Sequence, residues 1–580
     1  MPADAIAAEI LVAGSARGDI LFSDVPLSFW GGVDSASGEV IDRHHPLSGQ
    51  RLAGKILAIP SSRGSCSGSG VILELILNGQ GPVAVLLERP DAIITLGVIV
   101  AEAVFGRSLP VLSLGKAGFA ALRSIRHAAV RGGAVVPLAN ADTTLPAGDI
   151  TETAPVPPAF DLSEKDRSIL AGNHGRAAQV AMQIVLKMAA IEGAGRLIDV
   201  SQAHIDGCIY TGPGGLAFAE QLRDWGGRVA VPTTLNAISV DQRQWRVQGI
   251  DPGFGEPASG LADAYVAMGA EPTFTCAPYL LDTAPVIGEQ IVWAESNAVV
   301  YANSVLGART VKYPDYLDIC IALTGRAPFS GPHTDAGRLP RLRITVPELV
   351  RIDDSFWPLL GYLIGGKADE DIPLIGGVAD LSPSLDDLKA FGAAFATTSG
   401  APMFHIAGVT PEALASDAAD ATLPTLALTM DDLRQAWGEL NGGSSGAIQL
   451  VSLGNPHFST TEIATLARLC EGRSKHEDVV LIVTCGRFTL EKARAAGHVA
   501  ALEAFGVQFV TDTCWCMIVE PLIPKKTRTI MTNSGKYAHY GPGLTGKDFR
   551  FGSLAACIEA AVSGTCGDGL PAWLAAAAGD

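Results

Sequence analysis

The chain has 580 residues, of which 48% are hydrophobic and 18% are charged, and its formal net charge is −18. Its length and apolar content favour several structural units with large cores and exclude a disordered chain. The negative charge argues against nucleic acid as a partner, because phosphates would be repelled. Since no apolar stretch is long enough to span a bilayer and no secretory signal pattern opens the chain, we expect a cytoplasmic protein that does not bind membranes.

The first part of the chain, residues 1–145, is rich in glycine and in short β-branched runs, which predict strands separated by turns. The expected strands are Lys55–Pro60, Val83–Leu87, Ile93–Leu96, Glu102–Phe105 and Leu109–Leu112. A helical pattern occurs at Val71–Leu77. Proline and threonine then become dense, which predicts an interdomain linker at residues 146–160. We therefore expect a β-rich domain that ends before this linker.

Beyond the linker, over residues 161–580, strand and helix patterns alternate. Ser163 is a suitable N-cap for a helical pattern that includes Ala177–Ala190. The remaining expected strands are Leu197–Ser201, Val229–Val231, Ala447–Ser452, Val479–Thr484 and Val507–Thr511, and the remaining helices are Leu216–Trp225, Thr461–Cys470 and Glu491–Phe505. Such alternation predicts the α/β class, with largely parallel sheets and more than one subdomain.

A loop rich in serine and glycine, Pro60–Gly70, lies between an expected strand and an expected helix. Backbone N–H groups in such a loop can bind an anion or stabilise a serine alkoxide. Arg63 can hold a carboxylate through two parallel hydrogen bonds. The alternative is a loop that only caps the helix, which is the commoner use of such a sequence.

The ten cysteines form no compact zinc pattern, and without a secretory context we expect them to be reduced. Taken singly, each is more often a small buried core residue than a ligand. However, thiolates from separate loops can converge on iron. The candidates at strand ends and near the C-terminus are Cys276, Cys485, Cys514, Cys516, Cys557 and Cys566.

Polar residues gather in several short segments that follow expected strands. In α/β folds the loops at the carboxyl ends of strands carry the site, so these segments are candidates for binding or catalysis. For any single histidine among them the alternative is a hydrogen-bonded structural role. The glycine-rich segment Thr211–Gly215 does not match a dinucleotide fingerprint and favours a tight turn. The residues concerned are His204, Asp206, Glu295, Asn303, Arg309, Asn455, His457, Asn533, Ser534, Lys536 and His539.

These segments together resemble the aconitase X family over nearly the whole chain. The marks in the first part include Phe29-Trp-Gly-Gly-Val-Asp34 and Arg63-Gly-Ser-Cys-Ser-Gly-Ser69. Those in the remainder include Val231-Pro-Thr-Thr-Leu-Asn236, Trp293-Ala-Glu-Ser-Asn297 and Asp512-Thr-Cys514. Both parts on one polypeptide resemble the single-chain branch of the family. The resemblance implies a swivel domain at residues 1–145 and an aconitase-like catalytic region at 161–580.

The resemblance also implies an activity and a cofactor. The single-chain branch dehydrates cis-3-hydroxy-L-proline to Δ1-pyrroline-2-carboxylate, with an iron–sulfur cluster as Lewis acid and a swivel-domain serine as base. Cys276 and Cys514 match the family's ligand motifs, and Cys557 and Cys566 are further choices. The archaeal branch has a cysteine where this chain has Asn455, which favours a small [2Fe–2S] cluster over the usual aconitase arrangement.

Further site residues come from the same resemblance together with the polar strand-end segments. Ser65 is the favoured base, Ser69 is an alternative, and Lys536 is a third catalytic candidate. The expected binding residues for a small hydroxy acid are Arg63, His204, Asp206, Glu295, Ser296, Asn297, Asn303, Arg309, Asn455, His457, Asn533 and Ser534. Two alternatives stay open: a dehydratase of another hydroxy acid such as mevalonate 5-phosphate, and a non-catalytic iron-sensing regulator. We expect a monomer.

Overall fold

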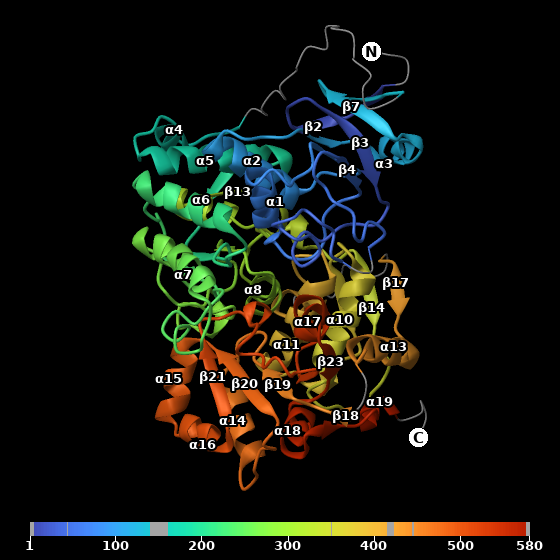
Figure 1. Cartoon of the computed structure of the whole chain (residues 1–580), viewed down its shortest axis with the longest axis vertical. Coiled ribbons are helices and arrows are strands. Elements are labelled where there is room, and N and C mark those ends of the chain that lie inside the picture. Colours follow the sequence, from blue (N-terminus) through green and yellow to red (C-terminus); the bar gives the residue numbers. More distant parts are fainter. Residues whose placement is uncertain are drawn as a thin grey trace. The chain divides into compact units, whose positions relative to one another are not determined.

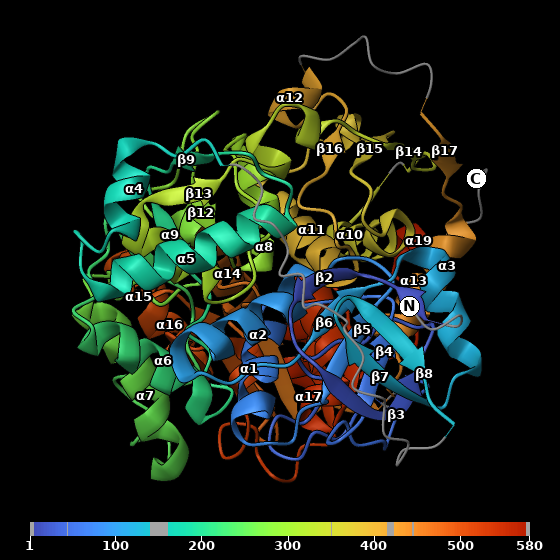
Figure 2. The same ribbon diagram turned by 90° about the horizontal axis from the view of Figure 1, so that it is seen from above.

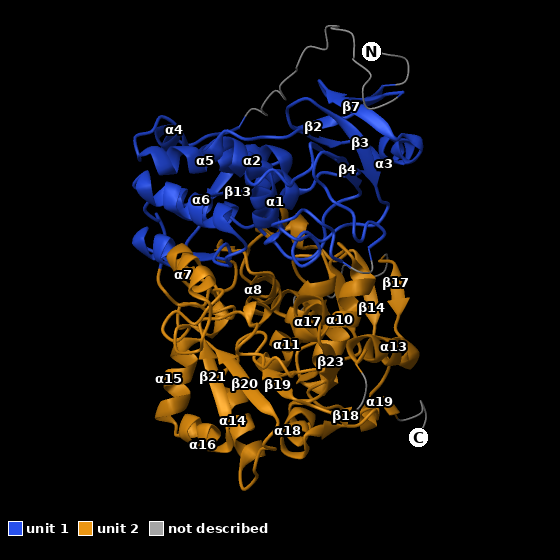
Figure 3. Cartoon of the chain, viewed as in Figure 1, with its two compact units in different colours: residues 1–233, 263–270, 313–330 blue, residues 234–262, 271–312, 331–580 orange. Residues whose placement is uncertain are grey.

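The computed structural model describes residues 5–42, 45–139, 160–349, 351–414, 423–443 and 446–575. The chain divides into two compact units (Figure 3). Unit 1 comprises residues 1–233, 263–270 and 313–330, and unit 2 comprises residues 234–262, 271–312 and 331–580. The linker expected at residues 146–160 lies outside the described residues, apart from Phe160. Strand β11 (Thr233–Leu235) and helix α7 (Pro252–Ala267) each contribute residues to both units.

Unit 1 contains an eight-stranded mixed sheet, of which Figure 1 labels β2, β3, β4 and β7. Its strand order is β1-β8-β7-β3-β4-β5-β6-β2. The central strands β3, β4, β5 and β6 are parallel, and the outer strands pair antiparallel. The bounds are β1 (Ile6–Ala7), β2 (Glu9–Val12), β3 (Ala16–Phe22), β4 (Ile56–Ile59), β5 (Ala84–Leu87), β6 (Val111–Ser113), β7 (His127–Arg131) and β8 (Ala134–Pro137). The strand-rich first part expected from the sequence is confirmed.

Three helices accompany this sheet, namely α1 (Gly68–Leu77), α2 (Ala92–Phe105) and α3 (Gly115–Ala121). The strands expected at Ile93–Leu96 and Glu102–Phe105 are wrong, because both segments belong to α2. Asp91 begins this helix by accepting a hydrogen bond from the Ile94 N–H at 2.9 Å. Because most of α2 is buried and apolar, its sequence has no polar face that would distinguish a helix from a strand.

The rest of unit 1 is mainly helical. Ser163 caps its first helix through a capping box with Asp166, which confirms the predicted N-cap. The single long helical pattern expected after it is wrong, because the chain breaks before Gly175, whose φ is +91°, and Ala177–Ala190 belong to a second helix. The strand expected at Val229–Val231 is wrong, since those residues are irregular. The elements are α4 (Glu164–Leu170), α5 (Arg176–Ile191), α6 (Pro213–Asp224), α9 (Leu317–Thr324), β9 (Leu197–Asp199), β10 (Ala203–Ile205) and β13 (Arg326–Pro328).

A buried ion pair stabilises this helical part. Arg326 Nε lies 2.7 Å from Asp166 Oδ1, and Arg326 Nη2 lies 3.1 Å from Asp166 Oδ2. The Asp166 side chain has no exposed surface. Burial alone would raise the pKa of Asp166, but Arg326 and Ser163 lower it below its usual value.

We expect Asp166→Ala to lower the free energy of unfolding by about 3–5 kcal/mol, because the Arg326 charge would stay buried without its bidentate partner. Asp199→Ala is the matched control, since Asp199 contacts the same guanidinium at 3.1 Å but is 72% exposed. It should cost only about 0–1 kcal/mol. Urea unfolding of both variants measures the difference, and equal destabilisation would contradict this assignment.

Unit 2 contains two parallel sheets flanked by helices. One has the strand order β21-β20-β19-β22-β23 and the other β16-β15-β14-β17. The strands are β12 (Val292–Trp293), β14 (Leu342–Thr345), β15 (Pro373–Gly376), β16 (His405–Ile406), β17 (Thr425–Ala427), β18 (Gly446–Ala447), β19 (Leu450–Leu453), β20 (Val480–Cys485), β21 (Val507–Thr511), β22 (Thr529–Thr532), β23 (Asp548–Phe551) and β24 (Thr565–Cys566). These layers confirm the expected α/β class.

The helices of unit 2 follow the strands in alternation, as Figure 1 shows. They are α8 (Ser296–Tyr301), α10 (Phe356–Ala368), α11 (Leu385–Thr398), α12 (Pro411–Leu414), α13 (Met430–Leu440), α14 (Thr460–Cys470), α15 (Arg487–Ala495), α16 (His498–Phe505), α17 (Gly535–Thr545), α18 (Leu554–Ser563) and α19 (Ala572–Ala575). The single helix expected at Glu491–Phe505 is wrong, because the chain breaks at Gly497, whose φ is +82°. Within the described ranges, no helix combines the length and the apolar character that crossing a membrane requires.

The five-stranded sheet has a separate hydrophobic cluster on each face. Side chains alternate along a strand, so Leu450 packs into one cluster while Val451 packs into the other. The Leu450 cluster includes Cys516 and Tyr537, and the Val451 cluster includes Cys557. The two faces therefore separate the cysteines of unit 2 into two groups.

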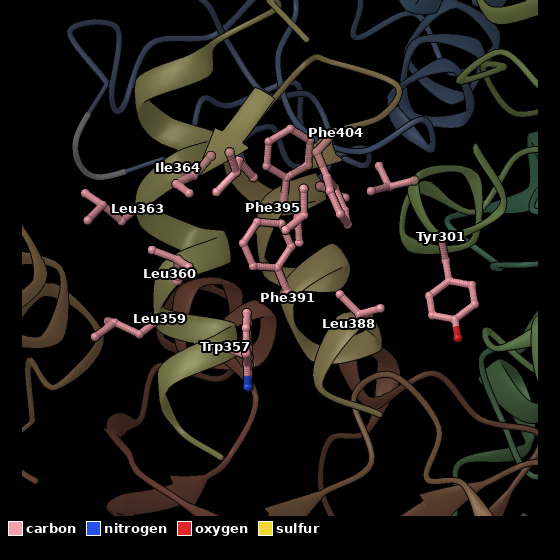
Figure 4. Close-up of a cluster of buried hydrophobic side chains, with 14 of the residues drawn as sticks. Tyr301, Trp357, Leu359, Leu360, Leu363, Ile364, Leu388, Phe391, Phe395 and Phe404 are labelled. Carbon is pink, nitrogen blue, oxygen red and sulfur yellow. The ribbon is translucent and has the colours of Figure 1, made fainter. Parts of the chain in front are cut away.

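A further core lies between α10 and α11, where aromatic side chains interlock (Figure 4). Phe391 and Phe404 meet edge to face with ring centroids 4.7 Å apart. Gly361 lets the two helices approach closely, because a Cβ there would lie 2.2 Å from the Phe391 carbonyl oxygen.

Candidate active site

A buried ion pair between Glu295 and Lys536 is the centre of the polar site in unit 2. Glu295 follows β12 and caps α8, while Lys536 lies in the first turn of α17. Lys536 Nζ donates to Glu295 Oε1 at 2.8 Å, and both side chains are at most 13% exposed. Two strand-end segments that are 241 residues apart in sequence thus meet at one charge pair.

Amide side chains complete the surroundings of Glu295. Asn297 Nδ2 donates to Glu295 Oε1 at 2.6 Å, and Asn236 Nδ2 donates to Oε2 at 3.1 Å. The Tyr279 hydroxyl in turn donates to Asn297 Oδ1 at 2.9 Å. Burial alone would raise the pKa of Glu295, but the charge and hydrogen bond of Lys536 lower it to about 2. Glu295 is therefore a carboxylate at neutral pH, with its oxygens committed to these donors.

Three cysteine thiols surround the Lys536 ammonium group. Burial would lower the pKa of Lys536, but the charges of Glu295, Cys516, Cys514 and Cys276 raise it well above its usual value. Lys536 therefore remains protonated and is the cation that these thiol groups face.

Cys514 and Cys516 follow strand β21 and are separated by one residue, Trp515. The Cys514 thiol donates a hydrogen bond to the Cys516 sulfur, which raises the pKa of Cys514 and lowers that of Cys516. Lys536 lowers the pKa of Cys516 further, and so does Asn455, whose Nδ2 lies 3.7 Å from the Cys516 sulfur. Cys516 is thus the thiol of this pair that forms a thiolate more easily.

Cys276 reaches the same group of side chains from the segment before α8. Its sulfur accepts a hydrogen bond from the His457 backbone N–H at 3.3 Å. Burial, followed by the charges of Glu295 and Cys514, raises the pKa of Cys276 to about 12. The His457 ring is held between the Thr513 carbonyl at 3.0 Å and the Thr275 hydroxyl at 3.2 Å. Burial lowers the pKa of His457 to about 4, so this buried ring is neutral and supports the wall of the site.

The loop that carries Cys514 is fixed by its own contacts. Arg487 binds both carboxylate oxygens of Asp512, each at 2.6 Å. The Cys514 backbone N–H donates to the Ile238 carbonyl at 2.9 Å, and the Ile238 N–H donates to the Asp512 carbonyl at 2.6 Å. Asp512 adopts a φ of +63°, a conformation that the paired guanidinium and backbone contacts hold in place.

The residues present fit an iron–sulfur cluster in their chemistry. Thiolates are the usual ligands of such clusters; Cys514 interacts with both Cys276 and Cys516, and all three interact with the same lysine. Among the residues that the structure describes, no three His, Cys, Asp or Glu side chains stand in the arrangement that holds a single metal ion. The fit therefore rests on the three thiols as ligands and on Lys536, the cation that interacts with all of them.

Two expected ligands, Cys557 and Cys566, lie elsewhere in unit 2. Cys557 is on α18 and packs in the cluster on the opposite face of the five-stranded sheet from Cys516. Burial, together with the charges of Asp354 and Cys566, raises its pKa well above the usual value. Cys566 lies in β24 and packs partly against this same cluster. The structure thus groups Cys276 and Cys514 with Cys516, and groups Cys557 with Cys566.

Asn303 and Arg309 belong to another polar cluster of unit 2. Asn303 Nδ2 donates to the carbonyls of Thr310 and Pro402, and Arg338 donates to the Asn303 carbonyl at 2.9 Å. Arg309 contacts Asp335, which is itself 90% exposed. These contacts tie loops together and leave the Asn303 side chain buried.

The remaining candidates of unit 2 lie at the start of two helices. Ser534 caps α17, accepting from the Tyr537 N–H at 3.1 Å and donating to the Asn455 carbonyl. Asn533 precedes it and is partly exposed, and Ser296, the first residue of α8, is also partly exposed. Asn455 therefore connects α17 to Cys516 through its main chain and its side chain.

The serine-rich loop of unit 1 places the three candidate serines Ser65, Ser67 and Ser69 in different surroundings. Ser69 is fully buried within α1 and donates to the Ile93 carbonyl at 2.9 Å. Ser67 is also buried, whereas Ser65 is partly exposed. The Ser67 backbone N–H and the Ser65 side-chain oxygen are 3.3 Å apart, with the N–H as donor. Arg63 is about half exposed and pairs with Asp42 at 3.0 Å.

His204 and Asp206 are also in unit 1, and both are buried. Asp206 follows β10, and its backbone N–H donates to Asp318 Oδ2 at 2.7 Å. Burial raises the pKa of Asp318 to about 6. His204 lies within β10 and Asp206 directly follows it, so the expectation that both residues lie in a loop after the strand Leu197–Ser201 is wrong, because Ala203–Ile205 form a strand of their own.

The sequence analysis missed Asn236 and Arg487 as site residues, and it considered Cys516 as a candidate thiol without choosing it as a ligand. The Cys514-Trp-Cys516 spacing was visible, but no compact pattern marked the second thiol as a member of the site. Asn236 belongs to the motif Val231–Asn236, which indicated the family but no role for this residue. Its partner Glu295 is 59 residues away in the sequence. Such long-range partners have no local signal.

The chain is thus an α/β protein in which Cys514 and Lys536 follow parallel strands of the five-stranded sheet, at the strand ends where such folds usually carry their site. Four family models match the chain. They are the aconitase X swivel domain at residues 5–136 and the aconitase X first, second and third domains at residues 159–336, 340–438 and 448–563. The chain belongs to the aconitase X family.

Relatives of the chain divide by how much of it they cover. A cis-3-hydroxy-L-proline dehydratase of Pseudomonas aeruginosa is 57% identical over 571 residues, 97% of each chain. A phosphomevalonate dehydratase large subunit of Methanocaldococcus jannaschii is 32% identical and covers 69% of this chain and 99% of its own. The crystal structure of holo-form aconitase X from Thermococcus kodakaraensis has a TM-score of 0.63, with 31% identity over 69% of this chain and 99% of its own. The full-length match places this chain in the single-chain branch.

Proposed function

We propose that this chain is a hydro-lyase that dehydrates cis-3-hydroxy-L-proline to Δ1-pyrroline-2-carboxylate. The observation that carries the proposal is the 57% identity over 97% of both chains to a cis-3-hydroxy-L-proline dehydratase. The match to a phosphomevalonate dehydratase subunit is weaker and leaves about a third of this chain uncovered. The reaction removes a proton from C2 and hydroxide from C3, and the resulting enamine tautomerises to the imine.

Unit 2 holds the groups that would help the hydroxide to leave. We propose that Cys276, Cys514 and Cys516 ligate an iron–sulfur cluster, in place of the set that included Cys557 and Cys566. When bound, such a cluster supplies a Lewis acid for the leaving hydroxyl. Lys536 stays protonated and offsets the negative charge of the thiolates, while Glu295 fixes the lysine by its 2.8 Å contact. Asn455 contributes a neutral amide beside Cys516.

We propose Ser65 as the base that takes the C2 proton. Of Ser65, Ser67 and Ser69 it is the one that is partly exposed, and the Ser67 N–H donates to its side-chain oxygen. Serine by itself is a weak base, so a donor that stabilises the alkoxide is required. Ser69 is less suited to the role, because its hydroxyl is buried and committed to the Ile93 carbonyl.

The proposal extends to the cluster type, the compartment and the assembly. Asn455 stands where the archaeal branch has a cysteine, which favours a [2Fe–2S] cluster. None of the ten cysteines, all within the described ranges, forms a disulfide, which agrees with a reducing cytoplasm. We propose that the chain acts as a monomer on its small substrate. Electron paramagnetic resonance of the reduced protein tests the cluster type, and light scattering tests the monomeric state.

A substrate panel tests the proposed activity. Purified anaerobic enzyme should convert cis-3-hydroxy-L-proline, with kcat/KM at least about 10²-fold higher than for the trans-3 and 4-hydroxy isomers, because base and leaving group must align with one stereochemistry. Mevalonate 5-phosphate is the competing substrate in the same panel. Preferential turnover of the phosphate ester would reject the proposal in favour of the other branch's activity. If none of these substrates is converted although the cluster is fully assembled, the alternative of a non-catalytic iron-sensing regulator would be favoured.

A further inference from the structure

The glycine-rich turn Thr211–Gly215 has no role in the reaction proposed above, yet it lies against the helix that follows the serine loop. Helix α1 packs beside α6 within unit 1, as both Figure 1 and Figure 2 show. The turn forms the N-terminal end of α6, and Ser65 lies three residues before α1 begins. Contacts between this turn and α1 therefore bear directly on the position of the serine.

Glu74 of α1 makes the closest of these contacts. Its Oε2 accepts a hydrogen bond from the Gly214 backbone N–H at 2.6 Å, and the Glu74 side chain is buried. Gly212, the N-cap residue of α6, has no side chain to cap the helix. The carboxylate of α1 thus occupies the position of a missing cap, where a helix N-terminus favours negative charge.

The close contact between Glu74 and the turn requires glycine at two positions. A Cβ at Gly212 would lie 2.7 Å from the Glu74 carboxyl group, and a Cβ at Gly214 would lie 2.9 Å from its Oε2. Atoms at such distances overlap, so a larger residue at either position would displace the glutamate. The motif that resembles a turn signal in the sequence is therefore shaped to receive a side chain of another helix.

Tyr316 fills the remaining space between the two helices. A Cβ at Gly70 of α1 would lie 3.0 Å from the Tyr316 hydroxyl, and a Cβ at Gly215 of α6 would lie 3.1 Å from it. The Tyr316 ring packs on Phe218 with centroids 4.7 Å apart, which holds the tyrosine against α6. The hydroxyl is thus a spacer between the two glycines.

Two further hydrogen bonds continue the same interface. The Asp315 backbone N–H donates to the Cys66 carbonyl in the serine loop at 3.4 Å. The Ser35 hydroxyl donates to the Thr211 carbonyl at 3.0 Å. The residue directly after Ser65 is therefore fastened to Asp315, and the turn also holds the separate segment at Ser35.

We infer that Thr211–Gly215, with Tyr316, is the docking site for α1, the helix that follows Ser65. Glu74 of α1 is then a positioning residue for Ser65. This inference rests on the proposed role of Ser65 as base. A shift of α1 by about 1 Å can lower the rate about 10²-fold, because proton transfer depends on the alignment of the base with the C2 proton. Substrate binding and cluster content depend on other residues and should change little.

The first test compares Glu74→Ala with Glu74→Gln. In Glu74→Ala we expect kcat to fall by about 10–10²-fold, with KM within about threefold of the wild-type value and unchanged iron content. Glu74→Gln keeps an acceptor oxygen for Gly214 and should recover most of the rate. Glu102→Ala is the control, because Glu102 joins α2 to α5 through an exposed 3.2 Å pair with Lys187. It should leave kcat unchanged.

A second test uses a clash and its relief. Gly215→Ala brings a methyl group against the Tyr316 hydroxyl and should lower kcat about tenfold. Tyr316→Phe removes that hydroxyl and keeps the ring stack on Phe218, so it should restore kcat in the double variant. This pair decides the question even if Glu74→Ala does not fold.

The outcomes separate the inference from the proposed function. A lower melting temperature with normal kcat in Glu74→Ala, or no rescue of Gly215→Ala by Tyr316→Phe, would overturn the positioning role. If Ser65→Ala itself kept normal kcat, the assignment of the base would fail instead. If kcat falls in both Ser65→Ala and Glu74→Ala and is largely restored in Glu74→Gln, the result supports Ser65 as the base and Glu74 as its positioning residue.

Discussion

Ser65→Ala should lower kcat by about 10²–10⁴-fold, the usual cost of losing a positioned base. The change removes one oxygen from a partly exposed side chain and leaves the Ser67 N–H free to bind water. We therefore expect the melting temperature, the iron content and KM to stay near the wild-type values. Steady-state kinetics under anaerobic conditions, with iron quantified in the same sample, measure the effect.

Ser67 and Ser69 of the same loop provide the matched controls for this variant. Ser69→Ala removes a buried hydrogen bond to the Ile93 carbonyl, so it should lower the free energy of unfolding by about 1 kcal/mol with little change in kcat. Ser67→Ala keeps the backbone N–H that supports Ser65, so it should be mild as well. A large loss of kcat confined to Ser69→Ala would transfer the base to that residue.

Cys514→Ala should abolish most of the iron and acid-labile sulfide in anaerobically purified protein, together with the visible absorption. The reason is that Cys514 interacts with both Cys516 and Cys276 around Lys536, so its loss leaves two thiols for the cluster. Cys276→Ala should have the same effect. Iron and sulfide determination, with the absorption spectrum, gives the answer without any turnover measurement.

Two cysteines on the other face of the five-stranded sheet provide the comparison. Cys485→Ala and Cys557→Ala each remove a buried thiol that packs in the cluster around Val451. Both should keep full iron and sulfide and lose only about 1–3 kcal/mol of stability from the smaller side chain. Loss of iron in Cys557→Ala would restore this residue to the ligand set that the sequence suggested.

Much of the fold was predictable because local patterns were strong. Ser163 was identified as an N-cap from its position before a helical pattern, and Val507–Thr511 matches β21 residue for residue. Helix α2 was misread because its buried sequence, Ala92–Phe105, lacks the alternation of polar and apolar residues that separates helix from strand. The break at Gly497 was missed because residues before and after it share one helical pattern.

The candidate site was predictable only where a motif carried it. The strand-end rule located Glu295 and Lys536, but their 2.8 Å contact depends on tertiary packing across 241 residues. Cys557 could not be separated from Cys514 in the sequence, because the face of a sheet on which a distant helix packs has no local signal. Of these two cysteines, only Cys514 packs on the same face of the sheet as Cys516, and that face is defined only in the folded chain.

The central claim is tested most directly by following cis-3-hydroxy-L-proline with the anaerobic enzyme in D2O by NMR. The account predicts loss of the C2 proton and of the C3 hydroxyl, with Δ1-pyrroline-2-carboxylate formed and solvent deuterium incorporated at C3, because the enamine takes a proton from solvent when it tautomerises. An unchanged substrate spectrum in the presence of a fully assembled cluster would contradict the account.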